Sequence, residues 1–185
     1  MNMKRLAVGL GIVLIMAPAL GSADAHPFHS KQSEDSGSYV SEGTQIDTNG
    51  DSRRADLVLT SGKGSHLGEI TTQAAVEWPK EFDSAVCNGH SGYKGNLVSG
   101  GFVIRTEKGD LLFGTFNSGT NCFDPITNSA NISLSGVFTG GTGKFTGVSG
   151  GSIAVSSTAI PVIADPLGHQ FGSVVSHTQL TLPHE

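Results

Sequence analysis

Short apolar and polar runs follow one another along most of the chain, and several of them alternate with a period of two. Such runs lie at residues 39–47, 55–60, 66–78, 96–106, 110–117, 131–139, 145–156 and 171–182. Between residues 39 and 185, no stretch of helical length carries apolar residues at helical spacing. The pattern predicts an all-β fold of about eight strands, and closing them into an antiparallel barrel leaves no unpaired edges.

The run at residues 66–78 shows the alternation most clearly. Glu69 and Glu77 share one face with other polar residues. The opposite face carries Ile70, Thr72, Ala74, Val76 and Trp78. Two interpretations stay open for the glutamates. Either their face is solvated, as is usual for Glu, or one of them stands at a barrel mouth and acts as a catalytic base.

Glycine accounts for 26 of the 185 residues, about 14%, against a usual share of roughly 7%. The glycines separate apolar runs and do not form a tract, which is typical of many turns joining many strands. They are densest between Phe138 and Val155, where they predict a strand, two tight turns around a Lys-Phe-Thr segment, and a second strand. The motif is defined by Phe138, Gly140, Gly141, Gly143, Phe145, Gly147 and Gly150.

Within this motif, Gly141 and Gly143 are expected to adopt backbone conformations closed to other residues. Lys144 and Phe145 are then held as a rigid step, so their side chains should point in opposite directions. We expect Phe145 to pack inward with Phe138 and Lys144 to be solvated. The motif is therefore predicted to be a folding element and not a ligand site.

The motif F-x-G-G-T-G-K-F-x-G-V-x-G at residues 138–150 resembles the turn of allene oxide cyclase and dirigent proteins, which are small antiparallel barrels related to the calycins. Gly62–Gly68 and Gly109–Thr115 extend the resemblance, which is to the small secreted bacterial members of this group. It implies a calycin-like barrel. It assigns no catalytic residue, because none of the residues that serve fatty-acid epoxide cyclisation or phenoxy-radical coupling in those proteins is matched here.

The first 25 residues have the pattern of a secretory signal. Lys4 and Arg5 precede a continuous apolar stretch at residues 6–20, and Ala23-Asp24-Ala25 supplies a small-x-small cleavage site. We expect cleavage after Ala25, a secreted or periplasmic location, and no membrane span after cleavage. The predicted organisation is a signal peptide at residues 1–25, a flexible segment at 26–38 and a single barrel domain at 39–185.

Charge and cysteine content narrow the function classes. Beyond the signal, the chain carries nine basic and fifteen acidic residues, a net charge of −6, and no basic cluster. Such a chain is a poor binder of nucleic acid. Its two cysteines, Cys87 and Cys122, are expected to form a disulfide in an exported protein, between the end of strand 66–78 and the loop after strand 110–117.

Residues 47–51 contain the best candidate ligands for a metal. Asp47, Asn49 and Asp51 place oxygen ligands at alternate positions around a turn glycine, as calcium loops do, and Asp56 would be a later ligand. The alternative is an Asn-Gly hairpin turn joining two strands. No other cofactor is expected.

Three functions remain open. The leading one is a non-catalytic exported barrel that binds a small apolar or amphipathic molecule or a protein partner. The second is an isomerase or cyclase of the allene oxide cyclase type, acting inside the barrel. The third is a calcium-stabilised surface protein.

Overall fold

The computed structural model describes residues 30–41, 53–164 and 170–182, which form ten β-strands and one short 3₁₀ turn. The elements are β1 Ser30–Ser41, β2 Arg54–Gly64, β3 Gly68–Trp78, β4 Asp83–Cys87, β5 His90–Asn96, β6 Ser99–Thr106, β7 Leu111–Asp124, β8 Ser129–Gly141, η1 Gly143–Phe145, β9 Ser152–Ala164 and β10 Gln170–Thr181. In these ranges no helix has the length and apolar character needed to cross a membrane.

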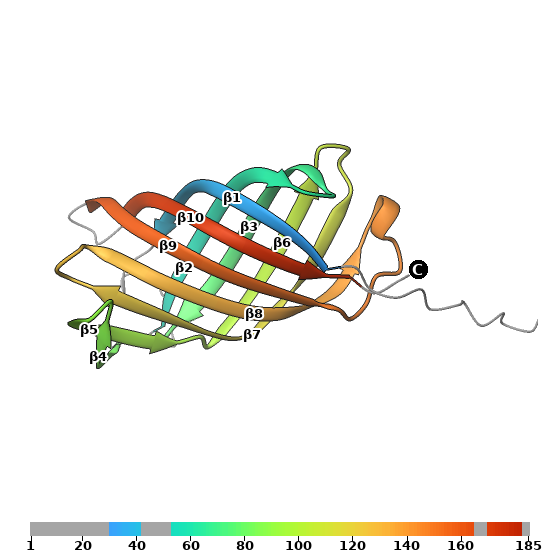
Figure 1. Cartoon of the computed structure of the whole chain (residues 1–185). Coiled ribbons are helices and arrows are strands. Elements are labelled where there is room, and N and C mark those ends of the chain that lie inside the picture. Colours follow the sequence, from blue (N-terminus) through green and yellow to red (C-terminus); the bar gives the residue numbers. More distant parts are fainter. Residues whose placement is uncertain (1–29, 42–52, 165–169, 183–185) are drawn as a thin grey trace, which may run out of the picture.

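Eight of the described strands form a closed antiparallel barrel (Figure 1). Their order around the ring is β7, β6, β3, β2, β1, β10, β9, β8, and the pairing of β8 with β7 closes it. The remaining two strands, β4 and β5, form a hairpin outside the ring, and β5 pairs with the last residues of β7. The predicted all-β antiparallel barrel of about eight strands is confirmed.

Alternation of side chains along the strands decides what faces the interior. In β3 burial distinguishes the two faces that the alternation predicts: Ile70, Val76 and Trp78 are buried, while Glu69 is exposed. The same period of two runs along β10, where Val174, Ser176, Thr178 and Leu180 are buried and Val175 is about half exposed. A closed ring of such strands has one enclosed face and one solvated face.

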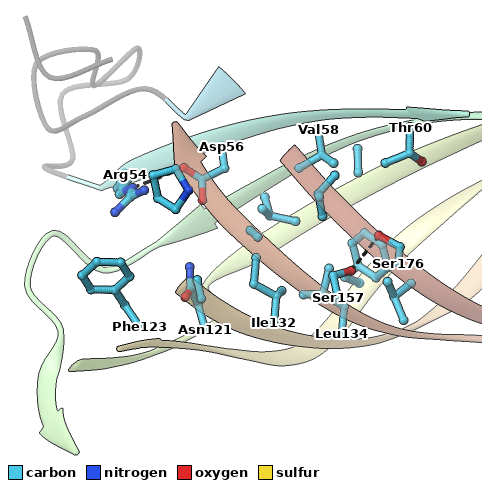
Figure 2. A pocket seen from close by; sticks show the side chains of 18 of the residues that line it. Arg54, Asp56, Val58, Thr60, Asn121, Phe123, Ile132, Leu134, Ser157 and Ser176 are labelled. Carbon is cyan, nitrogen blue, oxygen red and sulfur yellow. Dashed lines mark hydrogen bonds and ion pairs between the residues drawn. The ribbon is translucent and has the colours of Figure 1, made fainter. Parts of the chain in front are cut away.

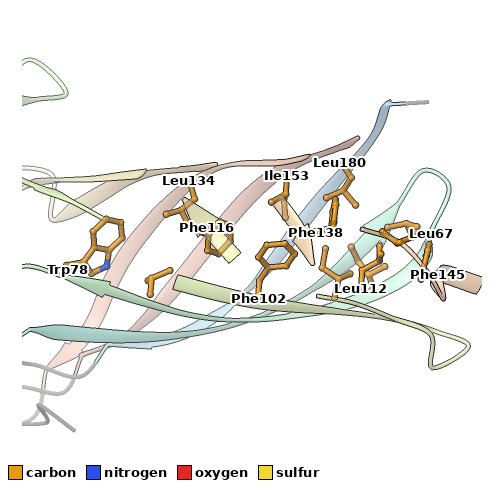
Figure 3. Packing of buried hydrophobic residues seen from close by; sticks show 14 residues of the cluster. Leu67, Trp78, Phe102, Leu112, Phe116, Leu134, Phe138, Phe145, Ile153 and Leu180 are labelled. Atoms are coloured by element: carbon orange, nitrogen blue, oxygen red, sulfur yellow. The ribbon is translucent and has the colours of Figure 1, made fainter. Parts of the chain in front are cut away.

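The interior is hollow toward one end and filled toward the other. The hollow part is a cavity of about 670 Å³ at the end where β2 begins and β3 ends (Figure 2). The filled part is a continuous apolar cluster that includes Phe102, Leu112, Phe138, Phe145 and Leu180 (Figure 3). The β4–β5 hairpin lies at the hollow end, and the η1 turn lies at the filled end (Figure 1).

The glycine motif closes the filled end. Its Lys-Phe segment forms η1, and the side chains of Phe145 and Val148 enter the apolar cluster from there. The turn is attached to the start of β7, because Thr142 Oγ1 accepts a hydrogen bond from the Leu111 N–H at 3.0 Å. Phe145 is buried in the same cluster as Phe138 and Lys144 is exposed, as predicted.

Gly141 and Gly143 of the motif are required for different reasons. Gly143 has φ +59°, a left-handed conformation that favours glycine, as expected. The conformational prediction is wrong for Gly141, which does not have positive φ. Its requirement is steric, since a Cβ there would lie 2.6 Å from Cβ of Phe145.

The structure corrects several predicted strand positions. Residues 30–38, expected within a flexible segment, belong to β1, which pairs with β10 on one side and β2 on the other. The strand expected to start at residue 145 starts at Ser152, because η1 and its turns occupy the residues before it. Residues 83–95, left without a strand prediction, form the β4–β5 hairpin together with Asn96, and the strand expected to start at residue 96 starts at Ser99.

Candidate functional site

The cavity exists because small side chains face inward at one end of the barrel. Along β8 the inward side chains are larger toward the filled end, from Ala130 through Leu134 to Phe138, and only Gly136 interrupts the increase. Along β9 they shrink in the opposite direction, from Ile153 at the filled end to Ala159. Neighbouring strands therefore leave the same end of the lumen empty.

One side of the cavity carries hydroxyl groups. They belong to β2, β3, β9 and β10, which lie on both sides of β1 in the ring: Thr60, Thr72, Ser157, Ser176 and Thr178. The hydroxyls of Ser157 and Ser176 are 2.8 Å apart and hydrogen-bond to each other. These hydroxyls can hydrogen-bond to a polar group and are themselves uncharged.

The opposite side of the ring, formed by β7 and β8, is mainly aromatic and aliphatic. Phe116, Phe123, Ile132 and Leu134 line the cavity there. Asn121 of β7 is the polar exception, lying between Phe123 and Ile132 in the wall (Figure 2). Ligand sites of this size typically combine an apolar lining with a few placed polar groups.

Asp56 is the buried carboxylate of the cavity wall. It is 6% exposed, and its Oδ2 accepts a hydrogen bond of 2.9 Å from Nε1 of Trp78. Its Oδ1 accepts a second one of 3.2 Å from Nε of Arg54. Asp56 is thereby held between two neighbours at the mouth, which is the arrangement a buried charge requires.

The β4–β5 hairpin lies against the mouth of the cavity. Phe82, just before β4, and Tyr93 of β5 both line the cavity. The ring of Phe82 packs edge-on against Trp78, with their centroids 6.5 Å apart. The hairpin thus extends the apolar wall beyond the ring of barrel strands.

A disulfide attaches this hairpin to the barrel. Cys87 and Cys122 are bonded, with their Cα atoms 5.6 Å apart, so the predicted pairing is confirmed. Their predicted places are wrong: Cys87 is the last residue of β4, and Cys122 lies within β7 and not in a loop. Asn88, at the tip of the hairpin, also hydrogen-bonds to Asn131 of β8.

A buried carboxylate provides a further attachment. Asp124, the last residue of β7, has no exposed surface, and its Oδ2 accepts a hydrogen bond of 2.8 Å from Nδ1 of His90 in β5. Its Oδ1 accepts a 2.9 Å bond from the Ile126 N–H in the β7–β8 turn. The bond from His90, aided by those from Thr127 and Ile126, holds the pKa of Asp124 well below its usual range, although burial opposes this.

The two glutamates considered as bases lie outside the barrel. Neither Glu69 nor Glu77 lines the cavity. Glu77 accepts a hydrogen bond of 2.6 Å from the hydroxyl of Ser99 and lies 3.6 Å from Nη1 of Arg53 on the outer surface. This placement favours the solvated interpretation of their face and gives neither carboxylate access to a molecule in the cavity.

The metal candidates Asp47, Asn49 and Asp51 lie outside the described residues. Asp56, considered as a later ligand of the same loop, lies within the described residues. Its carboxylate accepts hydrogen bonds from Arg54 and Trp78. Within the part of the chain that the structure describes, no three His, Cys, Asp or Glu residues gather in a way that would hold a metal ion.

Comparisons with protein-family models, curated proteins and solved structures find no match to this chain. The resemblance to allene oxide cyclase and dirigent barrels therefore stays a prediction that rests on the glycine motif. The function has to be argued from the cavity.

Sequence reasoning missed the residues around the mouth. The signal for the hairpin was Asn88-Gly89, which has φ values of +54° and +86° and forms the tight turn between β4 and β5. Asn-Gly between two short runs is a strong indication of a hairpin. Asn121 has no comparable signal, because the irregularity of β7 between Phe116 and Ser118 shifts which of its residues face inward.

Proposed function

We propose that this protein is an exported, non-catalytic barrel that binds a small amphipathic molecule in its cavity. The observation that carries the proposal is the cavity itself, about 670 Å³ in volume and lined by both apolar and hydroxyl-bearing side chains. Drug-sized ligands occupy cavities of about 300–1,000 Å³. The signal-like N-terminus and the disulfide support an extracytoplasmic location.

The enclosed interior favours a small molecule over a protein partner. Hydroxyls on one side and apolar side chains on the other match a molecule with a polar group and an apolar body. A cyclase would use the same cavity, but the glutamates considered as its base lie on the outer surface. Asp56, a carboxylate buried in the described lining, is held by hydrogen bonds from Arg54 and Trp78. Binding without chemistry therefore fits the described residues best.

A cavity-filling substitution tests the proposal. Ala74 faces the cavity from β3, whereas the next residue, Ala75, is exposed on the outer surface. Ala74→Phe should weaken the binding of the neutral dye N-phenyl-1-naphthylamine by about tenfold or more, since steric overlap typically costs about 1–3 kcal/mol. Dye fluorescence measured against protein concentration gives the affinity.

Ala75→Phe is the matched control, with the same change on the neighbouring residue and the opposite face. It should bind the dye as the unchanged protein does. Equal affinities for all three proteins, or no dye binding by any of them, would show that the cavity is not a binding site. Native mass spectrometry of the exported protein would in addition report any molecule that it carries.

A further inference from the structure

The charges on the described residues of the cavity wall are balanced. Among the described residues, four charged side chains line it, two cations and two carboxylates: Arg54, Asp56, Lys80 and Glu81. Arg54 and Asp56 form an ion pair at 3.2 Å, and Lys80 and Glu81 are exposed. This described part of the lining therefore attracts neither an anionic nor a cationic group preferentially, and its remaining polar side chains carry hydroxyls and one amide.

Two buried polar atoms of the lining lack a partner. Oδ1 of Asn121 and Oγ1 of Thr72 have no hydrogen bond among the described residues. Asn121 as a whole is only 4% exposed. Buried polar atoms in folded proteins are nearly always hydrogen-bonded, so each such atom calls for a partner that the fold does not provide.

The surroundings of Asn121 make its polar side chain costly for folding alone. It lies in the wall beside Phe123 and Ile132, where an aliphatic residue of similar size would pack without leaving an unpaired oxygen. The terminal torsion of Asn is broad, so the amide can turn its oxygen or its nitrogen toward the cavity at low cost. A primary amide can both accept from and donate to one hydroxyl group.

We infer that the cavity selects uncharged amphipathic molecules that carry a hydroxyl group, and that Asn121 is the residue that binds this group. Thr72, on a different part of the wall, offers a second hydrogen bond. The apolar body of the molecule lies against Phe116, Leu134 and Ile153. This inference rests on the proposed function and specifies its ligand class.

Four probes of equal chain length separate the ligand classes: 1-decanol, decanoate, decylammonium and decane. Each is titrated at pH 7 against the protein loaded with N-phenyl-1-naphthylamine, and the loss of fluorescence measures displacement. Decanol should displace the dye at a lower concentration than decanoate, decylammonium or decane. A charged probe that competes better than decanol would overturn the inference while leaving the proposed function intact.

Asn121→Leu tests the residue. It should raise the decanol concentration needed for displacement by about tenfold, the change that a lost hydrogen bond brings, and leave decane unaffected. Its melting temperature should equal or exceed that of the unchanged protein, because the unpaired oxygen is gone. Asn117→Leu, an exposed change on the same strand, is the control and should alter neither value.

Each remaining outcome is decisive. If Asn121→Leu retains the preference for decanol over decane, the assignment of Asn121 is wrong. Should Leu not fit, Asn121→Ala removes the amide with a smaller side chain and must show the same loss of preference. Absence of dye binding by the unchanged protein would refute the proposed function itself, which distinguishes the two failures.

Discussion

Phe145 and Lys144 are adjacent residues with opposite environments at the filled end of the barrel. Phe145 is 5% exposed and packs in the apolar cluster, whereas Lys144 is exposed with its ammonium group 4.8 Å from the centre of the Phe145 ring. The ring is therefore buried in the core and also in contact with a cation. Burial is the larger of the two contributions, since a cation–π contact at an exposed site is worth about 0.5–1 kcal/mol.

Phe145→Ala should lower the free energy of unfolding by about 3–5 kcal/mol, because the cavity left behind adds to the lost burial. Lys144→Ala, its matched neighbour, should cost less than about 1 kcal/mol. Urea unfolding of both variants measures the two values. A large loss for Lys144→Ala with little for Phe145→Ala would mean that η1 does not close the barrel as described.

The β4–β5 hairpin is the element that depends most on specific attachments. It lies outside the ring and is held by the pairing of β5 with β7, by the disulfide and by the bond between His90 and Asp124. A two-stranded hairpin is marginally stable on its own in water. Without these attachments, the hairpin would not stay over the mouth.

Replacing both Cys87 and Cys122 by Ser should destabilise the protein by up to about 4 kcal/mol, the chain-entropy value for a loop with a sequence separation of 35. Relative to the unchanged protein, hydrogen exchange should become faster at residues 83–96. The increase should be larger there than at the filled end of the barrel. The unchanged protein under oxidising conditions is the reference. An unaltered unfolding midpoint together with unaltered exchange would show that the disulfide does not hold the hairpin.

The elements also show how far the sequence alone could lead. The residues that share each face of β3 could be predicted because its alternation is clear. The disulfide partners followed from an even cysteine count. β1 was missed because Ser30–Ser41 is mostly polar, and its strand structure comes from backbone pairing on both sides. The hairpin was missed although Asn88-Gly89 marks its turn.

The cavity was partly predictable in the same way. The inward residues Ala130, Leu134 and Phe138 of β8 increase in size along the strand apart from Gly136, which sequence alternation alone could reveal. That β9 and β10 place their small residues at the same end depends on register. The pairing of Trp78 with Asp56 depends on register too, since 22 positions separate them. Such contacts follow from the closed ring and not from local pattern.

At the scale of the whole molecule, closure of the barrel depends on β1, a strand that the sequence pattern does not predict over most of its length. β1 pairs with β2 over nine registered positions and with β10 along its full length, Ser30–Ser41. Without it the ring would open between β2 and β10 and leave two unpaired edges. Unpaired edges are sites of aggregation, and an open sheet could not enclose the cavity.

Truncation of the chain tests this directly. A chain that begins at Ser30 keeps all of β1. It should unfold in a cooperative transition without aggregating and should bind the dye with the affinity of the longer form. A chain that begins at Tyr39 loses nine of its twelve β1 residues. It should aggregate or lose its cooperative thermal transition and should not bind dye, because neither β2 nor β10 can pair across the gap. Light scattering and thermal melting compare the two chains. If the shorter chain melts at the same temperature and binds the dye equally well, residues 30–38 are dispensable and the ring closes without β1.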